Sequence, residues 1–247
     1  MASSSQVRAS RREQLEASRL AQAQKERRAR ILIVGAGVVL FAIVLGLALW
    51  GFLAGNAKSG NGRPPNSTAA GDGILAAPLV PGVPTLEIYT DYNCAYCQSS
   101  HFTLSALIDD AVDAGTLNVI YRARVSLHAS SRSAAMAAAC ADVQGMFQAY
   151  DDALYRNQSS DGFTTNTLLV TIPEHIGLTG EALSEFTDCF GESRMSSFID
   201  AQVAQAAKQK VNQSPTFFLN GEDITIPIFN ENTGTYDPDL LRAVIGL

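Results

Sequence analysis

Residues that bind metal ions are scarce in this sequence, whose 247 residues include only four cysteines and three histidines. A structural zinc site normally uses four Cys or His ligands, which are often supplied as two close pairs. Only Cys94 and Cys97 form such a pair, and the histidines, His101, His128 and His175, are scattered. The chain also lacks an internal repeat. The sequence therefore disfavours a zinc-binding module and a repeat architecture.

Charged side chains are absent from residues 31–54, a segment of 24 residues. A helix of that length spans a hydrocarbon core of about 30 Å at about 1.5 Å per residue. Residues 1–30 carry eight Lys or Arg against three Asp or Glu, a net charge of +5, and Arg27, Arg28 and Arg30 adjoin the uncharged segment. The positive-inside rule then predicts a basic cytoplasmic tail over 1–30, a single transmembrane helix over 31–54 in the cell membrane, and an extracytoplasmic remainder.

Other interpretations of this N-terminal region are weaker. The basic tail could indicate a nucleic-acid partner, but the adjacent apolar segment explains it better as a topology signal, so no nucleic acid is expected. A cleaved signal peptide is the alternative to the anchor, with residues 55–57 as a small-residue cleavage site. The apolar core of a signal peptide is typically only about 7–15 residues long, which favours an uncleaved anchor in contact with membrane lipid.

Two further regions follow the predicted anchor. Residues 55–82 are rich in Gly, Pro, Asn, Ser and Ala, a composition that predicts a flexible linker. The folded domain is therefore expected over residues 83–247, which is long enough to bury a core of its own.

Strand and helix patterns in this domain follow an order typical of an α/β fold. Patterns over 83–90, 98–114 and 117–122 predict a strand, a helix and a parallel strand in a right-handed βαβ unit. The expected layout continues with a helical insertion over about 130–210 and then ββα. Its remaining elements are helices over 134–155, 164–176, 179–190 and 194–210, strands over 216–219 and 224–226 joined by a turn at Asn220-Gly221, and a final helix over 237–245.

Cys94 and Cys97 lie between the first predicted strand and the first predicted helix. A cysteine at a helix N-terminus is close to unpaired N–H groups and to the positive end of the macrodipole, which favours its thiolate. We expect Cys94 to be the exposed nucleophile and Cys97, one turn into the helix, to be more buried. The pair then supports a cycle in which a substrate thiolate attacks Cys94 and a second substrate thiol resolves the mixed disulfide. A structural disulfide and half of a zinc site are the alternatives.

Pro215 precedes a short predicted strand, where a proline cannot donate to a central ladder. Taken alone, it is typical of an ordinary trans residue between a loop and a strand. Together with the cysteine pair, it indicates a cis Ser214–Pro215 bond beside the reactive sulfur. The Ser214 backbone could then pair with an extended substrate and hold a substrate sulfur against Cys94.

Cys140 and Cys189 lie in the predicted helical insertion. In an extracytoplasmic domain the even number of cysteines predicts a structural disulfide between these two. Closing a loop of about 50 residues would stabilise the domain by about 4 kcal/mol in the chain-entropy estimate. The alternative is a pair of buried apolar thiols.

Three ionisable residues lie close to the cysteine pair in the sequence: Glu87, Asp91 and His101. A carboxylate near the pair could shuttle a proton to Cys97. We interpret Glu87 and Asp91, however, as strand-end or surface acids, and His101 as a packing or surface residue.

These motifs together resemble the DsbA-like branch of the thioredoxin superfamily, in particular its membrane-anchored bacterial forms. The resemblance implies a thioredoxin fold with a helical insertion, with Cys94 as nucleophile, Cys97 as resolving thiol and Pro215 as the cis-proline. It also supports a second disulfide, Cys140–Cys189, and implies neither a metal nor another cofactor. The matching stretches are residues 88–97, 134–140 with 145–147, and 214–221.

The chain departs from this family pattern at three positions. Ala95 stands where many members have Pro, and Ser214 stands where many have Thr or Val. Glu87 lies one residue out of register with the acid that the family places near the buried cysteine. Ala95 and Tyr96, between the cysteines, are expected to tune the redox potential and, with Ser214, to contact the substrate.

The resulting prediction is an anchored, extracytoplasmic thiol-disulfide oxidoreductase that oxidises cysteine pairs of exported proteins. The resemblance implies a possible reoxidant, a quinone-coupled membrane protein like vitamin K epoxide reductase. Two alternatives stay open. The same pair could serve an isomerase or a reductase, or the fold could be a non-catalytic anchored module that binds a partner or a metal.

Overall fold

The computed structural model of the chain describes residues 62–247. The predicted basic tail, the predicted transmembrane helix and the start of the predicted linker lie outside the described residues. Within 62–247, none of the helices combines the length and the apolar character needed to cross a membrane.

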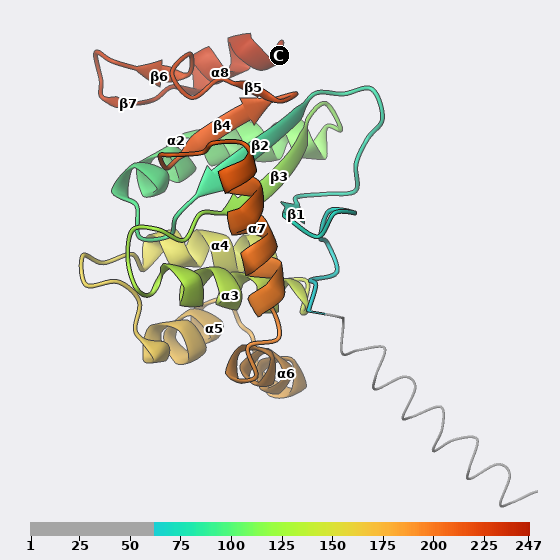
Figure 1. The fold of residues 1–247 in the computed structure, drawn as a ribbon, viewed down its shortest axis with the longest axis vertical. Coiled ribbons are helices and arrows are strands. Elements are labelled where there is room, and N and C mark those ends of the chain that lie inside the picture. The colour runs from blue at the N-terminus through green and yellow to red at the C-terminus, as the bar shows by residue number, and fades with distance from the viewer. Residues whose placement is uncertain (1–61) are drawn as a thin grey trace, which may run out of the picture. The chain divides into compact units, whose positions relative to one another are not determined.

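A five-stranded sheet, in the order β1-β3-β2-β4-β5, forms one part of the domain. The strand β2 (Thr85–Thr90) pairs in parallel with β3 (Asn118–Ala123) and antiparallel with β4 (Thr216–Leu219). The helix α2 (Ala95–Asp113) connects β2 to β3. Figure 1 shows the sheet in the upper part of the view and the inserted helices below it. The predicted βαβ unit and the mixed α/β fold are confirmed.

The helical insertion occupies the chain between β3 and β4. The single helix predicted over 134–155 is two helices, because Gly145 adopts a positive φ of 69° and the chain turns there. In Figure 1 the last inserted helix runs back alongside the sheet and leads into β4. The inserted elements are α3 (Ser131–Asp142), α4 (Phe147–Arg156), the π-helical turn η1 (Thr167–Thr171), α5 (Ile172–His175), α6 (Gly180–Gly191) and α7 (Ser196–Lys208).

The C-terminal part of the sheet begins with a tight turn after β4. Asn220 and Gly221 have φ values of 52° and 86°, as a two-residue hairpin turn requires. Pairing therefore resumes at once in β5 (Glu222–Asp223), so the return strand predicted over 224–226 is wrong by two residues. A short hairpin of β6 (Phe229–Asn230) and β7 (Thr235–Tyr236), which was not predicted, precedes α8 (Pro238–Ile245).

Buried apolar side chains form two main clusters. One lies between the sheet, α2 and α8, and includes Leu86, Leu104 and Leu241. The other lies among the inserted helices and also includes Cys94 and Cys97. The cysteine pair is carried by the sheet domain but is buried against the insertion.

Residues 62–82 pack on the domain, in contrast to the flexible linker predicted over 55–82. Ile74 and Leu75 form β1, which pairs antiparallel with β3. The backbone and side-chain nitrogens of Asn66 donate to the Asp142 carboxylate at 2.9 and 2.8 Å. Composition alone predicted flexibility because these contacts depend on partners far along the chain.

A buried ion-pair cluster adds to this attachment. The Arg122 side chain is only 6% exposed and lies 2.7 Å from Asp72 and 2.9 Å from Glu87. Removing either carboxylate would leave the buried positive charge of Arg122 partly unpaired, which destabilises the fold. Glu87 is therefore a partly buried structural acid, and the interpretation of it as a strand-end or surface residue is wrong.

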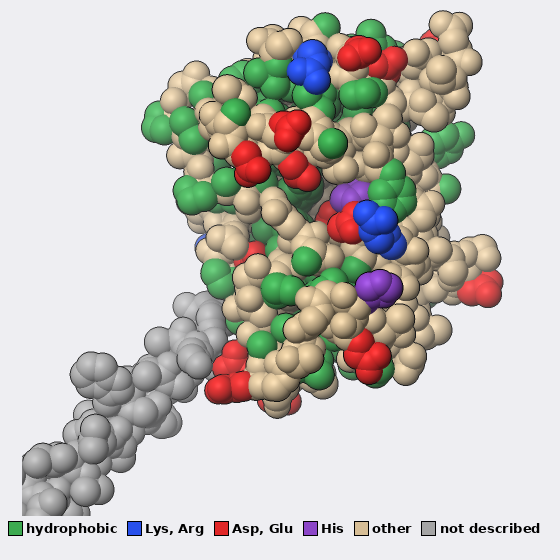
Figure 2. All heavy atoms as spheres, turned by 180° about the vertical axis from the view of Figure 1, so that it is seen from behind, with side chains coloured by type: hydrophobic (Ala, Val, Ile, Leu, Met, Phe, Trp, Pro, Cys, Tyr) green, Lys and Arg blue, Asp and Glu red, His purple; other side chains and the backbone are tan. Residues whose placement is uncertain are grey.

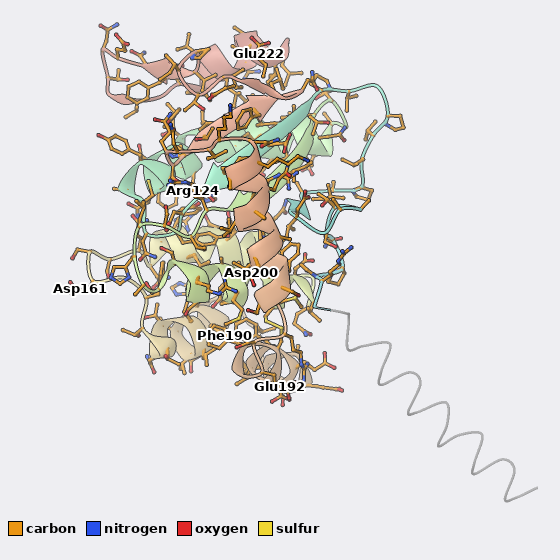
Figure 3. The ribbon with its side chains drawn as sticks, viewed as in Figure 1. Arg124, Asp161, Phe190, Glu192, Asp200 and Glu222 are labelled. Atoms are coloured by element: carbon orange, nitrogen blue, oxygen red, sulfur yellow. A yellow bond between two sulfur atoms is a disulfide. The ribbon has the colours of Figure 1, made fainter. Side chains whose placement is uncertain are left out.

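Cys140 of α3 and Cys189 of α6 form a disulfide with a Cα–Cα distance of 5.8 Å. The predicted disulfide is confirmed. Figure 3 labels Phe190, the residue after Cys189, in the lower part of the helical insertion. The bond thus ties together two helices that lie 49 residues apart in the sequence.

Replacing both residues, Cys140→Ala with Cys189→Ala, should lower the free energy of unfolding by about 4 kcal/mol, because the unfolded chain regains the freedom of a loop of about 50 residues. Urea unfolding of the variant and the parent protein measures the difference. A reducing agent that opens Cys140–Cys189 should remove most of the difference between the parent and the double variant, because both proteins keep Cys94 and Cys97. An equal free energy of unfolding in both proteins would contradict the prediction.

Candidate active site

Cys94 is the N-cap residue of α2. Its backbone is extended, and its sulfur accepts a hydrogen bond from the Cys97 amide at 3.3 Å. The first intrahelical bond runs from the Gln98 amide to the Cys94 carbonyl. The helix therefore begins at Ala95, three residues earlier than predicted, because a cysteine supplies its cap.

The two sulfurs have opposite electrostatic surroundings. The hydrogen bond between the two cysteine side chains and the Cys97 and Tyr96 amides lower the pKa of Cys94 to about 7, against the opposing effect of burial. Burial raises the pKa of Cys97 well above its ordinary value. The predicted division between a nucleophile and a protonated partner thiol follows from these surroundings.

Cys94 is less exposed than expected. The whole residue is 5% accessible and Cys97 is fully buried. The reason is that the Cys94 sulfur lies against another loop, where its thiol donates to the Ser214 carbonyl at 3.2 Å. The expectation of an openly exposed nucleophile is therefore wrong, although Cys94 is still the outer residue of the pair.

The loop that covers Cys94 contains the predicted cis bond. The Ser214–Pro215 peptide is cis, and the Ser214 carbonyl is the group that contacts the sulfur. The structure thus brings Ser214, Pro215 and Cys94 together, as the sequence predicted.

Arg124 also contacts this loop and was missed in the sequence. Its guanidinium is 3.4 Å from the Ser214 hydroxyl and 3.1 Å from the Asn212 carbonyl. Figure 3 labels it where the chain leaves the sheet after β3. Residues 62–247 contain nine Lys or Arg against 21 Asp or Glu, and Figure 2 shows groups of acidic side chains on one face. The positive charge of Arg124 against the Ser214 loop therefore contrasts with the excess of acidic residues in this domain.

The residues between the cysteines face outward. Ala95 is exposed, and Tyr96 is 61% exposed. Leu127, whose amide donates to the Asp91 carboxylate close to the pair, is 54% exposed. Apolar side chains that a partner could cover therefore lie near Cys94.

Asp91 directly follows β2, as expected of a strand-end acid, but it is buried and does not lie on the surface. It is 1% exposed, and its amide lies 3.5 Å from the Cys97 sulfur. Both carboxylate oxygens are fully engaged, each accepting two hydrogen bonds. The donors are the amides of Asn93, Ser126 and Leu127 and the hydroxyl of Ser131, at 2.6 to 3.0 Å.

Gln158, in the helical insertion after α4, supports the loop from the other side. Its side-chain nitrogen, Nε2, donates to the backbone carbonyls of Tyr92 and Cys94 at 2.7 and 3.1 Å. The local sequence around Gln158 does not identify it as a site residue, because its partners lie more than 60 residues away. The insertion thus fixes the backbone that carries the nucleophile.

Within residues 62–247, no three or more His, Cys, Asp or Glu side chains are grouped so that they could hold a metal ion.

The thiolate of Cys94 should titrate with a midpoint at about pH 7, the value to which its pKa is lowered. Alkylation of the reduced protein by iodoacetamide at increasing pH, followed by mass spectrometry, measures the midpoint and the residue that reacts. The variant Cys97→Ala removes the largest lowering contribution and should raise the midpoint. A midpoint at the ordinary thiol value in the parent protein would contradict the argument.

Comparisons with known proteins agree with this geometry. The family described as thioredoxin matches residues 82–236, which are 155 of the 247 residues. No curated protein matches the chain.

Solved structures are similar over most of the domain. The thiol-disulfide oxidoreductase MdbA from Actinomyces oris is 13% identical, with 75% of this chain and 92% of that chain covered and a TM-score of 0.61. BdbD from Bacillus subtilis is 16% identical, with 74% and 96% covered and a TM-score of 0.58. DsbA from Mycobacterium tuberculosis is 21% identical, with 70% and 90% covered and a TM-score of 0.53. The predicted resemblance is confirmed, and the chain belongs to the thioredoxin family.

Proposed function

We propose that this protein is a thiol-disulfide oxidoreductase of the DsbA type that exchanges disulfides through Cys94 and Cys97. The observation that carries the proposal is the contrast between the two thiols: Cys94 caps a helix with a pKa lowered to about 7, whereas Cys97 is buried with a raised pKa. Thioredoxin-family membership and the similarity to solved oxidoreductases support the same enzyme class.

Each turnover moves two electrons from the substrate to the cysteine pair. A substrate thiolate attacks Cys94 in the Cys94–Cys97 disulfide, and Cys97 leaves and takes up a proton. A second substrate thiolate then attacks the substrate sulfur of the mixed disulfide. The substrate disulfide forms, and Cys94 leaves as a thiolate that the helix N-terminus stabilises.

Substrate is held by backbone pairing beside the cis-proline loop. An extended segment next to Ser214 would present its sulfur to Cys94, because the Ser214 carbonyl already lies 3.2 Å from that sulfur. The exposed Tyr96 side chain next to the nucleophile offers an apolar contact to the same segment. These contacts recognise an unfolded or extended chain rather than a particular fold.

The direction of exchange is proposed to be oxidation, because a lowered nucleophile pKa stabilises the reduced enzyme. The value of about 7, however, is close to the ~7 of thioredoxin and well above the ~3.5 of DsbA. That observation favours a mild oxidant and keeps a reductase or isomerase as the second candidate.

We further propose that the domain acts outside the cytoplasm, anchored by residues 31–54, on cysteine pairs of exported proteins. The absence of charge in that segment and the arginines before it support the anchor. The Cys140–Cys189 disulfide supports an oxidising compartment. A quinone-coupled membrane protein like vitamin K epoxide reductase would return the cysteine pair to the disulfide.

A Cys97→Ser variant should accumulate mixed disulfides, because it keeps the nucleophile and lacks the resolving thiol. Cys94→Ser should accumulate none and should not oxidise a reduced, unfolded substrate protein. Non-reducing electrophoresis and mass spectrometry detect the adducts. Full activity of the Cys94→Ser variant would remove Cys94 from the mechanism, and a parent protein that forms no adduct and oxidises no substrate would favour a binding module.

The reduction potential of the Cys94–Cys97 pair should lie between about −120 mV, the value of DsbA, and about −270 mV, the value of thioredoxin. Equilibration with glutathione buffers measures it. Cys140→Ala with Cys189→Ala is the matched control that excludes a contribution from the second disulfide. A value at the thioredoxin end would replace oxidation by reduction as the proposed direction.

A further inference from the structure

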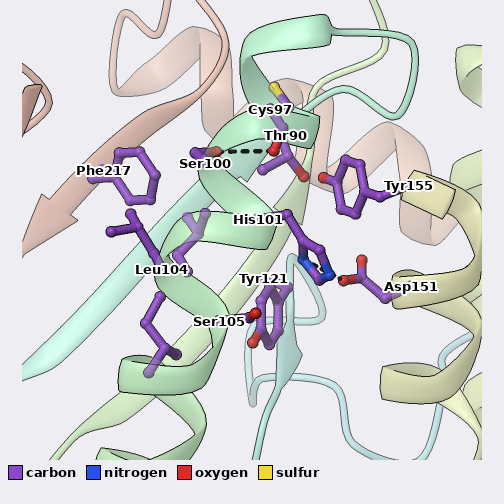
Figure 4. A pocket seen from close by; sticks show the side chains of 12 residues that line it. Thr90, Cys97, Ser100, His101, Leu104, Ser105, Tyr121, Asp151, Tyr155 and Phe217 are labelled. Atoms are coloured by element: carbon purple, nitrogen blue, oxygen red, sulfur yellow. Dashed lines mark hydrogen bonds and ion pairs between the residues drawn. The ribbon is translucent and has the colours of Figure 1, made fainter. Parts of the chain in front are cut away.

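A small cavity, partly open to the surface, lies against Cys97. Its volume is about 30 Å³, in which about two water molecules fit at 10–15 Å³ each. The lining includes Cys97, His101, Asp151 and Tyr155. Figure 4 shows Thr90 and Tyr155 between Cys97 and the pair formed by His101 and Asp151. The buried thiol and a buried carboxylate thus line the same small cavity.

Asp151 has unused capacity to accept a proton. Its Oδ1 accepts the Tyr92 hydroxyl at 2.6 Å, and its Oδ2 lies 3.6 Å from His101 Nδ1. The other ring nitrogen of His101 lies 3.2 Å from Asp152. Burial raises the pKa of Asp151, against the lowering effects of His101 and Tyr92. A carboxyl shifted in this direction is a better base near neutral pH than an ordinary one.

Tyr155 connects the two ends of the cavity. Burial raises the pKa of Tyr155, and the charges of Asp151 and of Cys97 raise it further, so its hydroxyl is electrostatically coupled to both groups. Its ring stacks on His101 with a centroid distance of 4.5 Å. Cys97 and His101 are four residues apart on α2, a rise of about 6 Å along the helix. Cys97 and Asp151 both line the cavity that a short water chain between them would occupy.

The acids closer to Cys97 in the sequence are not free for this role. Asp91 accepts four hydrogen bonds, so protonating it would break part of the loop that holds the cysteines. Glu87 is paired with Arg122. The strand residues between them that line the cavity are Ile88 and Thr90, neither of which has an acidic group.

We propose that Asp151, positioned by His101 and Tyr92, exchanges the proton of Cys97 through water in this cavity. The inference rests on the proposed exchange function. It adds to that function the group that takes the proton from the buried Cys97 thiol. Asp151 belongs to α4 of the helical insertion, so the insertion would take part directly in disulfide exchange.

The proton balance is the same in both directions of exchange. When the mixed disulfide on Cys94 is resolved, Cys97–SH gives its proton to the Asp151 carboxylate, and the Cys97 thiolate attacks the Cys94 sulfur. The Cys94–Cys97 bond forms, and the bond from Cys94 to the substrate breaks, which releases the substrate thiolate. When a substrate thiolate opens the disulfide instead, the protonated Asp151 returns the proton to the departing Cys97 thiolate.

Several other ionisable groups face these two and set the pH range of the exchange. Those that act on Asp151 come from α2, from β3, from the loop before Cys94 and from α4 itself. Those that act on Cys97 come from the nucleophile, the loop before it, α4 and the C-terminal hairpin. The first set is His101, Asp109, Tyr121, Tyr92, Asp152 and Tyr155, and the second is Cys94, Asp91, Tyr155 and Tyr236.

The test uses the full chain with Asp151→Asn, which keeps an acceptor for Tyr92 and removes the base. Reduced protein is mixed with excess oxidised glutathione, and samples are quenched with acid. Mass spectrometry then measures the amounts of reduced protein, mixed disulfide and Cys94–Cys97 disulfide. Attack by Cys94 should be unchanged. Conversion of the mixed disulfide to the Cys94–Cys97 disulfide should slow about 10²-fold at neutral pH, the lower end of general acid–base contributions. The loss should shrink as rising pH ionises Cys97 directly.

The matched control is Asp152→Asn, which removes a carboxylate from the same histidine but does not line the cavity. Because Asp152 changes only the charge around Asp151, its loss should change the rate of resolution by no more than about twofold. Equal rates of resolution in the parent and both variants would overturn the proposal. An equal loss of rate in both variants would assign the proton exchange to His101 instead of Asp151. If no adduct forms on Cys94 at all, the proposed function fails instead.

The parent protein supplies an independent measurement if Asp151→Asn does not fold. Its resolution rate should show an inflection from an internal base as pH rises from about 5 to 9. A rate proportional to hydroxide over that whole range would mean that solvent alone removes the Cys97 proton, and the proposal would be wrong.

Discussion

The hydrogen bond from the Cys97 amide to the Cys94 sulfur is the interaction on which the rest of this site depends. It fixes the helix start at the nucleophile, and it aims the unpaired N–H groups of that turn at a sulfur rather than at water. The same turn buries the second sulfur completely. One helical turn thereby creates two thiols of different acidity, and the sheet, the loop at Ser214 and the insertion all serve to keep that turn in place.

The helical insertion is part of the site as well as of the core. Gln158 holds the carbonyl groups around Cys94, and the apolar cluster of the insertion includes both cysteines. A thioredoxin sheet supplies the strand and the helix that present the pair. The insertion supplies the cover that raises the pKa of Cys97, because burial is the largest contribution to that shift.

The sequence predicted those features that depend on neighbours or on paired motifs. Cys94 with Cys97, the cis bond before Pro215 and the Cys140–Cys189 disulfide could each be inferred from residue type and context. Gln158 and the burial of Asp91 could not, because their partners come from other elements of the fold. The packing of residues 62–82 was missed for the same reason, since a Gly- and Pro-rich segment acquires order only from distant contacts.

The Cys140–Cys189 bond encloses the chain between α3 and α6 in a covalent ring. Asp151 and Gln158, the two insertion residues that reach the redox site, both lie inside this ring. So does the exposed Asp161, which Figure 3 labels on a projecting loop. A protease that cut the backbone at that loop would leave both halves of the insertion joined through sulfur, so the nicked protein would stay one covalent molecule.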